Sequence, residues 1–155
     1  MKQFVDDIIS YISSNIAADT DIAKTVKVCE AFKQGDTLTP PQISVQALDD
    51  SDALVYNTFE GEQVSYVPIQ ITVYTAQMKI GGATKSAQDC AMIFADKIKA
   101  MFDLITTTQW NNNIVRMRRI GGIPAMPVET GATTYMSPIR FDFYVTNPYT
   151  NLNNN

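Results

Sequence analysis

The chain of 155 residues contains no histidine. This absence excludes a Ser-His-Asp or Cys-His catalytic centre, because both need an imidazole as the base. It also excludes zinc and iron sites whose ligands include histidine. An enzyme with this sequence would have to use carboxylates, lysine or tyrosine. A pair of carboxylates across a cleft, as in glycosidases, stays open, although no spacing in the sequence favours it.

Cysteine is almost as scarce, with only Cys29 and Cys90 in the chain. Cys90 falls on the apolar side of a predicted helix, and Cys29 falls in a strand-like run. Neither has the spacing of a metal ligand. The pattern predicts two small buried hydrophobic side chains in a reducing compartment, with a disulfide between them as the less favoured alternative.

Long apolar runs and an excess of basic residues are missing as well. No run approaches the length that spans a bilayer, so no membrane contact is expected. The N-terminus carries Asp6 and Asp7 and no small-residue cleavage site, so we expect no signal peptide. The net charge of -4 argues against a protein that grips nucleic acid with its whole surface.

A strand and a helix within residues 64–105 form the predicted nucleus of the fold. Apolar residues at 67, 69, 71 and 73 alternate with mixed residues, which predicts a strand with one apolar face. Residues 87–105 repeat apolar side chains at three- and four-residue steps, which predicts a helix with one apolar stripe. Ser86, or alternatively Thr84, is the predicted cap of this helix.

The other predicted elements surround this nucleus in chain order. They are a helix over residues 2–16, strands over 26–32 and 42–48 that form a hairpin, a turn over 56–63, a strand over 114–120 interrupted by Gly121 and Gly122, an extended excursion or loose hairpin over 123–134, and a strand over 139–146. The order predicts one α+β domain over residues 1–149, in which a mostly antiparallel sheet is packed by an N-terminal helix and one long central helix. Residues 150–155 are predicted to be a polar, disordered tail.

Two polar motifs are candidate ligand sites. The stretch from Gly81 to Ser86 ends in Lys-Ser as a phosphate-binding loop does, but the glycines that such a loop needs are absent at the right spacing, so a flexible loop before a helix cap is expected. Asp49, Asp50 and Asp52 carry oxygen ligands for a hard cation. A solvated acidic turn is the favoured interpretation of these three residues.

Arginine and aromatic residues are candidates for contacts with a partner. Arg116 and Arg118 share one face of a predicted strand, while Arg119 opposes them. These arginines fit an acidic partner or a phosphate backbone, and a solvated strand face with Arg119 paired to a carboxylate fits equally well. The aromatic residues on mixed faces or in loops, which fit either an interface or partial burial, are Tyr66, Tyr74, Tyr144 and Trp110.

Over about residues 1–147 the chain resembles the tail terminator proteins, also called tail-completion or minor tail proteins, of long-tailed bacteriophages. The features that carry the resemblance are the N-terminal helix, the stretch Pro41-Gln42-Ile43-Ser44-Val45 before an acidic turn, the alternating strand over residues 67–74, the alanine-rich helix over 87–101 and the aromatic strand over 139–145. They are pattern features and contain no catalytic signature.

The resemblance implies a structural virion protein that is assembled in the host cytoplasm. Such proteins form a hexameric ring on the head-proximal end of the tail tube, stop its polymerisation and join it to the head–tail connector. The genomic DNA passes through the ring without specific binding, and no enzyme activity, catalytic residue, metal or cofactor is implied. Six copies at -4 each would repel DNA wherever that charge lined the channel.

For this role we expect interface contacts from Gly81, Gly82, Trp110, Arg116 and Arg118. The connections 77–83 and 123–134 are candidates for reaching a neighbouring subunit. Two other classes of protein stay open. One is a different neck or tail component, such as a head–tail stopper or a tube subunit, and the other is a small ligand-binding domain or enzyme.

Overall fold

The computed structural model describes residues 2–30, 37–48, 53–57, 63–103, 114–129 and 133–146. The elements, in chain order, are α1 (Lys2–Ala17), β1 (Lys27–Glu30), β2 (Gln42–Ala47), β3 (Ala53–Asn57), β4 (Gln63–Thr75), β5 (Met78–Ile80), β6 (Ala83–Lys85), α2 (Ala87–Asp103), β7 (Ile114–Gly122), β8 (Met126–Pro127) and β9 (Tyr135–Thr146). The predicted tail at 150–155 lies outside the described residues.

Seven strands form one sheet in which β4 and β9 are the central pair. The order is β1-β2-β4-β9-β7, with β3 also paired to β4 and β8 also paired to β9. β4 and β9 run antiparallel in continuous register from Val64, opposite Thr146, to Thr75, opposite Tyr135. Every pairing in this sheet is antiparallel except that of β1 with β2. The α+β architecture with a mostly antiparallel sheet, predicted from the sequence, is confirmed.

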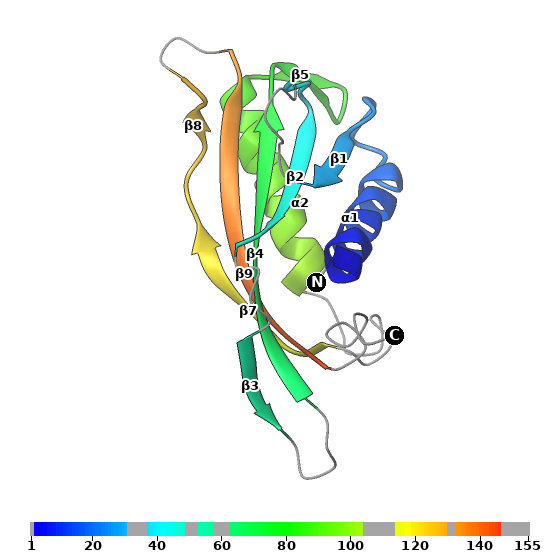
Figure 1. Ribbon diagram of the computed structural model, residues 1–155. Coiled ribbons are helices and arrows are strands. Elements are labelled where there is room, and N and C mark those ends of the chain that lie inside the picture. Colours follow the sequence, from blue (N-terminus) through cyan, green and yellow to red (C-terminus); the bar gives the residue numbers. More distant parts are fainter. Residues whose placement is uncertain are drawn as a thin grey trace.

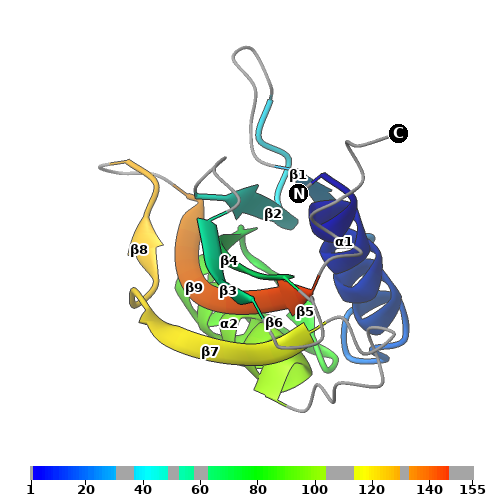
Figure 2. The same cartoon turned by 60° about the horizontal axis from the view of Figure 1, so that its bottom comes forward.

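Both helices cover the same face of this sheet (Figures 1 and 2). The apolar face of β4, predicted from its alternation, is fully buried and packs with the matching face of β9 and with both helices. Phe102 of α2 lies at the centre, with its ring centroid 4.9 Å from that of Phe141, 6.0 Å from that of Phe143 and 5.5 Å from that of Tyr11 in α1. One aromatic cluster therefore joins the sheet to both helices.

Side-chain hydrogen bonds fix where α2 begins and how the two helices meet. Ser86 is the N-cap, because its Oγ accepts a bond of 3.1 Å from the backbone N–H of Asp89. The alternative cap, Thr84, belongs to β6. The Tyr11 hydroxyl donates to the Met101 carbonyl at 2.8 Å, which ties α1 to the last turn of α2. Burial raises the pKa of this phenol.

The predicted hairpin of the first two strands is wrong, because β1 and β2 are parallel. Lys27 lies opposite Gln42, and Glu30 lies opposite Val45. A two-strand hairpin needs a short turn, whereas a parallel neighbour needs a connection that returns to the start of the first strand. Residues 31–41 are long enough to make that return, and the Lys27 N–H donates to the Pro41 carbonyl at 3.2 Å where the two strands begin.

Three further differences from the sequence prediction concern short or glycine-rich segments. The region from residue 53 to 57 forms β3, and the connection expected over 77–83 lies in the β5–β6 hairpin, whose Met78 and Ile80 are buried in the core. β7 includes Gly121 and Gly122 instead of ending before them. Of the two alternatives expected for residues 123–134, the loose hairpin is confirmed, because β8 pairs with β9 and the Val128 N–H donates to the Thr134 carbonyl at 3.0 Å.

Both cysteines are free thiols, as the favoured interpretation predicted. Cys90 is fully buried in the core, and burial raises the pKa of its thiol. Cys29 is partly buried on β1, where its Sγ accepts a hydrogen bond of 3.3 Å from the Gln42 amide. No helix in the described ranges is both long enough and apolar enough to cross a membrane.

An ion pair between α2 and the α1–β1 turn predicts a measurable pH dependence. Lys97 Nζ lies 2.5 Å from Asp19 Oδ2, and this hydrogen bond holds the pKa of Asp19 below its usual value. Because the pKa of Asp19 is lower in the folded chain, its ionisation stabilises the fold at pH values above the unfolded-state pKa of about 3.9. This stabilisation is lost as the pH falls through the folded-state pKa. We expect Lys97→Met to lower the free energy of unfolding by about 0.5–1 kcal/mol at pH 7 in urea titrations, with a smaller difference at pH 3. An equal difference at both pH values would contradict this.

Candidate interaction surface

The face of the sheet opposite the helices carries the side chains that best fit contact with a partner. We call it the open sheet face. Its pattern follows from register, because residues that lie opposite each other on neighbouring strands point to the same side. Its described members on β4, β9 and β7 are Tyr66, Pro68, Gln70, Thr72, Tyr74, Pro138, Arg140, Asp142, Tyr144 and Arg118.

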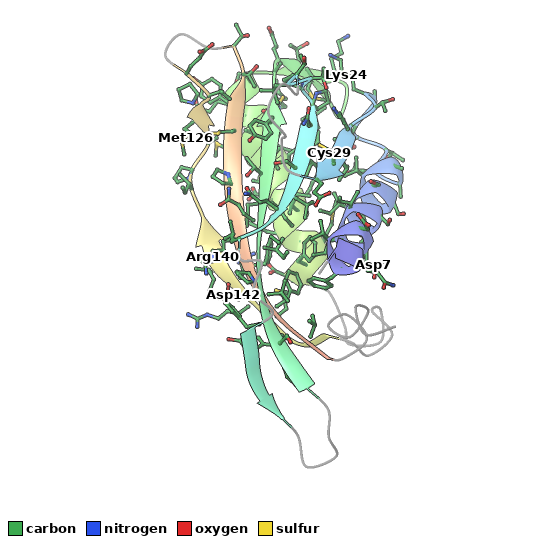
Figure 3. All side chains as sticks on the ribbon, viewed as in Figure 1. Asp7, Lys24, Cys29, Met126, Arg140 and Asp142 are labelled. Atoms are coloured by element: carbon green, nitrogen blue, oxygen red, sulfur yellow. The ribbon has the colours of Figure 1, made fainter. Side chains whose placement is uncertain are left out.

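Tyr66, Arg140 and Asp142 form a hydrogen-bonded network on this face. The Tyr66 hydroxyl donates to Asp142 Oδ1 at 2.9 Å and accepts from Arg140 Nη2 at 2.9 Å. Arg140 Nε also lies 3.4 Å from Asp142 Oδ1. Figure 3 shows Arg140 and Asp142 near each other along β9. The two arginine bonds use two of the five guanidinium N–H donors, so the group keeps donors for a ligand.

Burial differs sharply within this network. The Asp142 side chain is only 12% exposed, whereas the Arg140 side chain is 46% exposed. Burial is the largest cause that raises the pKa of Tyr66, and its hydrogen bond to Asp142 acts in the same direction. The hydrogen bond to Tyr66 raises the pKa of Arg140, which keeps the guanidinium charged at every physiological pH. The network therefore holds the exposed guanidinium of Arg140 in place against the buried carboxylate of Asp142.

Replacing Tyr66 by phenylalanine tests this network. The change removes one donor from Asp142 and one acceptor from Arg140 without removing the ring. Because Asp142 is buried, we expect the free energy of unfolding to fall by about 1–2 kcal/mol in urea titrations. Tyr144→Phe is the matched control, since the Tyr144 ring lies beside Tyr66 in the neighbouring strand, with the two ring centroids 5.7 Å apart. If Tyr144→Phe lowered the free energy of unfolding as much as Tyr66→Phe, the stabilising role of the Tyr66 hydroxyl in this network would be contradicted.

Arg118 and Arg119 lie on opposite sides of β7, as the alternation predicted, whereas the side chain of Arg116 lies outside the described part of the chain. Arg118 is exposed and lies opposite Asp142, and Arg116 lies opposite Tyr144 in the register. Arg119 faces the helices, where its Nη1 is 2.6 Å from Asp103 Oδ2 at the end of α2. Among the described residues Arg118 has no salt-bridge partner, so its charge is available to another molecule.

A hollow of about 330 Å³ lies beside Arg140 on the same face. Its lining includes Gln70 of β4, Ile120 of β7 and Pro138 of β9. The register of β7 shifts between Arg119 and Gly121, which opens the strand at this point. Ile120 and Ile123, at the edge of the hollow, are 44% and 53% exposed. The site thus combines a fixed cation with exposed apolar side chains, a pairing typical of protein interfaces.

A second groove of about 400 Å³ lies on the helix side of the same edge, between α2 and the segment that follows β7. Met92, which is 52% exposed, lines it together with Ile123, Asp96 and Lys99. The two hollows therefore meet at Ile123. In the described ranges, no group of three or more His, Cys, Asp or Glu residues is placed to hold a metal ion.

Gly81 and Gly82 form the turn of the β5–β6 hairpin, away from the open sheet face. Their φ angles are +61° and +79°, a left-handed backbone at two consecutive residues, as a type I′ turn requires. The Gly81 N–H donates to the Asp21 carbonyl at 2.9 Å, which holds the hairpin against the α1–β1 turn. This geometry explains the two glycines without a partner, and their interface role stays a prediction.

The remaining sequence-derived sites have different outcomes. Trp110 lies outside the described residues, as do Asp49, Asp50 and Asp52. Tyr74 and Tyr144 share the open sheet face, as predicted, and both are partly buried.

Arg140 and Asp142 were not among the site residues predicted from the sequence. Their spacing of two in an alternating strand was the available signal, but the Tyr66 contact depends on a pairing across 76 residues.

No protein-family model matches the chain, and no curated protein matches it at a significant level of similarity. The open sheet face and the edge at Ile123 are therefore interpreted from their own chemistry.

Proposed function

We propose that this protein is a tail terminator of a long-tailed bacteriophage. In this role it forms a ring on the head-proximal end of the tail tube, stops tube polymerisation and presents a surface to the head–tail connector. It acts in the virion, after assembly in the host cytoplasm, as a structural protein without a catalytic centre or a cofactor.

The observation that carries the proposal is that the two faces of the sheet differ, because one forms the core and the other presents arginine and tyrosine side chains. Two helices bury one face of the sheet, while the other face presents Arg118 and Arg140 with partly buried tyrosines. Arginine and tyrosine are enriched where proteins meet. The order of elements also agrees with the family that the sequence resembles, from the N-terminal helix to the aromatic last strand.

A ring requires two different surfaces on each subunit that fit each other. The sheet supplies β1 at one end of its strand order and β7 at the other, so the two ends differ in sequence and charge. β7 carries three arginines and the exposed apolar residues Ile120 and Ile123 beside its end. Such asymmetry supports side-to-side contacts that repeat around a ring.

The proposal is tested by assembly on purified tail tubes. We expect the purified chain to bind one end of each tube and to block further growth when free tube subunits are added, as seen by electron microscopy. A tube subunit would instead extend the polymer, which distinguishes that alternative directly. Unrestricted growth in a large excess of the chain, with no density at the tube end, would contradict the proposal.

A further inference from the structure

An exposed aliphatic side chain and an exposed acid lie next to each other just after β8. Val128, which is 39% exposed, follows Pro127, and Glu129 comes next. Glu129 is exposed and has no salt-bridge partner among the described residues. Of the exposed large hydrophobic residues that the structure describes, Val128 alone is followed by an acidic residue that it also describes. We call these two residues the Val128–Glu129 pair.

The hollow beside Arg140 has the complementary character. It measures about 330 Å³, and the exposed side chains of Ile120 and Ile123 line it together with Arg140. Tyr66 and Asp142 take two of the five guanidinium N–H donors of Arg140. The remaining donors belong to a planar group whose shape suits a carboxylate. The hollow therefore offers a place for a carboxylate beside a place for an aliphatic side chain.

The walls of the hollow are held in position before any partner arrives. The Ile123 N–H donates to the Pro138 carbonyl at 3.0 Å, and the Ile123 carbonyl accepts a bond of 3.1 Å from the buried Ser137 hydroxyl. The register of β7 against β9 skips Ile120, and Gly121 next to it has a φ of +134°, which favours glycine. Because these walls are already ordered, docking there costs little conformational entropy.

A subunit cannot fill this hollow with its own Val128–Glu129 pair. Pro127, directly before the pair, lies opposite Tyr135, whereas Gly121 at the hollow lies opposite Arg140. Five residues of β9, or about 16 Å, separate Tyr135 from Arg140. Figure 3 shows Met126 of β8 well above Arg140. The pair and the hollow are therefore two separate surfaces of one subunit.

We propose that the Val128–Glu129 pair of one copy docks in the hollow beside Arg140 of the next copy, with Val128 against Ile120 and Ile123 and the Glu129 carboxylate on Arg140. The inference rests on the proposed ring, since it names two surfaces that meet there. Each copy gives one surface and receives the other, which is the kind of contact that a closed ring repeats. Opposite charges fix the orientation of the contact, while the aliphatic side chains exclude water from it.

The chemistry of the hollow favours this occupant over a nucleic acid. Tight binding of a phosphate backbone uses many cationic contacts, about 6–10 in strongly salt-dependent cases. Among the described residues that line the hollow, Arg140 alone is charged, and Ile120, Ile123 and Pro138 lie around it. One cation among aliphatic side chains suits one carboxylate beside one aliphatic side chain, and the Val128–Glu129 pair supplies both.

A double-mutant cycle tests the pairing of Glu129 with Arg140. Self-association of E129Q, of R140Q and of the chain with both substitutions is measured by light scattering and native mass spectrometry. We expect each single variant to lower the association constant by about 10-fold, because each removes one charge of the same pair. The double variant is expected to lose no more than either single variant. Losses that multiply to about 100-fold would show two independent effects and would contradict the pairing.

The control variant D21N removes one negative charge from an exposed position in the α1–β1 turn, where the Asp21 side chain is 61% exposed. We expect it to assemble as the wild type does. Urea titrations check that R140Q keeps the folded state, because this change also removes a partner of the buried Asp142.

Cysteine trapping tests the same contact without requiring a stable ring. E129C and I123C are made separately in a C29S chain, in which the remaining Cys90 is fully buried, and one of the two variants carries a mass tag. We expect a mixture under mild oxidation to give a disulfide-linked dimer that contains one copy of each variant. In the control, K24C replaces I123C, because Lys24 is exposed and lies far from Arg140 in Figure 3.

The outcomes separate this inference from the ring proposal. Wild-type rings, together with cross-linking at I123C no stronger than at K24C, would overturn the inference and leave the ring intact. Preferential cross-linking at I123C in a chain that forms no ring and caps no tube would support the contact and contradict the ring. If R140Q associates as the wild type does but no longer caps tubes, the hollow contacts the tube instead of a second copy, which would also overturn the inference.

Discussion

Ile71→Asp is expected to unfold the protein or to lower its free energy of unfolding by at least about 4 kcal/mol. Ile71 is fully buried in β4, between Val45 of β2 and Ile139 of β9. A carboxylate at this position would lose its hydration without gaining a partner among the apolar residues of the core. The loss is measured by urea or thermal denaturation, followed by circular dichroism.

The pH dependence of this variant has a definite sign. Burial raises the pKa of a carboxyl group, so the new aspartate destabilises the fold most when the unfolded chain is ionised. The difference from the wild type is therefore expected to shrink as the pH falls towards about 4, the value of an unfolded aspartate. A difference that grows at low pH would contradict burial of the new group.

Gln70→Asp is the matched control, because the same residue is introduced one position earlier in the same strand. Gln70 is on the open sheet face, is partly exposed and lies opposite Arg140. The new carboxylate would keep contact with water and with a nearby cation, so we expect a change within about 0.5 kcal/mol. Equal losses at positions 70 and 71 would contradict a sheet with one buried and one open face.

Phe102→Ala is expected to lower the free energy of unfolding by about 3–5 kcal/mol. The Phe102 ring is fully buried, and its three aromatic neighbours come from two other elements: Tyr11 of α1, and Phe141 and Phe143 of β9. Truncation removes buried apolar area and leaves a cavity that these packed neighbours fill poorly.

Met92→Ala is the control for this substitution. Met92 is on the same helix and is 52% exposed, so its truncation is expected to cost less than about 1 kcal/mol. Urea titrations of both variants give the comparison. If Phe102→Ala lowered the free energy of unfolding by less than Met92→Ala does, the aromatic cluster would not be the centre of the core.

Local patterns in the sequence predict β4 and α2 because one side of each element is uniformly apolar. Val67, Ile69, Ile71 and Val73 alternate without a break, and all four are buried. The stripe of α2 and its Ser86 cap are also local features, and the structure confirms both. Periodicity decides such elements because burial of a whole face outweighs the propensity of single residues.

Local sequence patterns could not predict the elements that depend on pairing between distant residues. β5 and β6 have three residues each, and the Gly81–Gly82 turn between them resembles a loop in sequence. The direction of β2 beside β1 depends on the path of residues 31–41, which no periodicity encodes.

The open sheet face was predicted in part for the same reason. Alternation correctly placed Arg118 on one side of its strand and Arg119 on the other, where it meets Asp103. The network of Tyr66 with Arg140 and Asp142 could not be predicted, because it requires the register of β4 against β9. A residue-by-residue list of polar side chains does not reveal which of them are buried together.

The mass of the assembled protein shows whether the chain forms a hexameric ring. Native mass spectrometry of the purified chain, alone and after elution from capped tail tubes, counts the subunits in each particle. We expect a discrete species of about 103 kDa, six times the chain mass of 17.2 kDa. A strict monomer that also fails to cap tail tubes would contradict it.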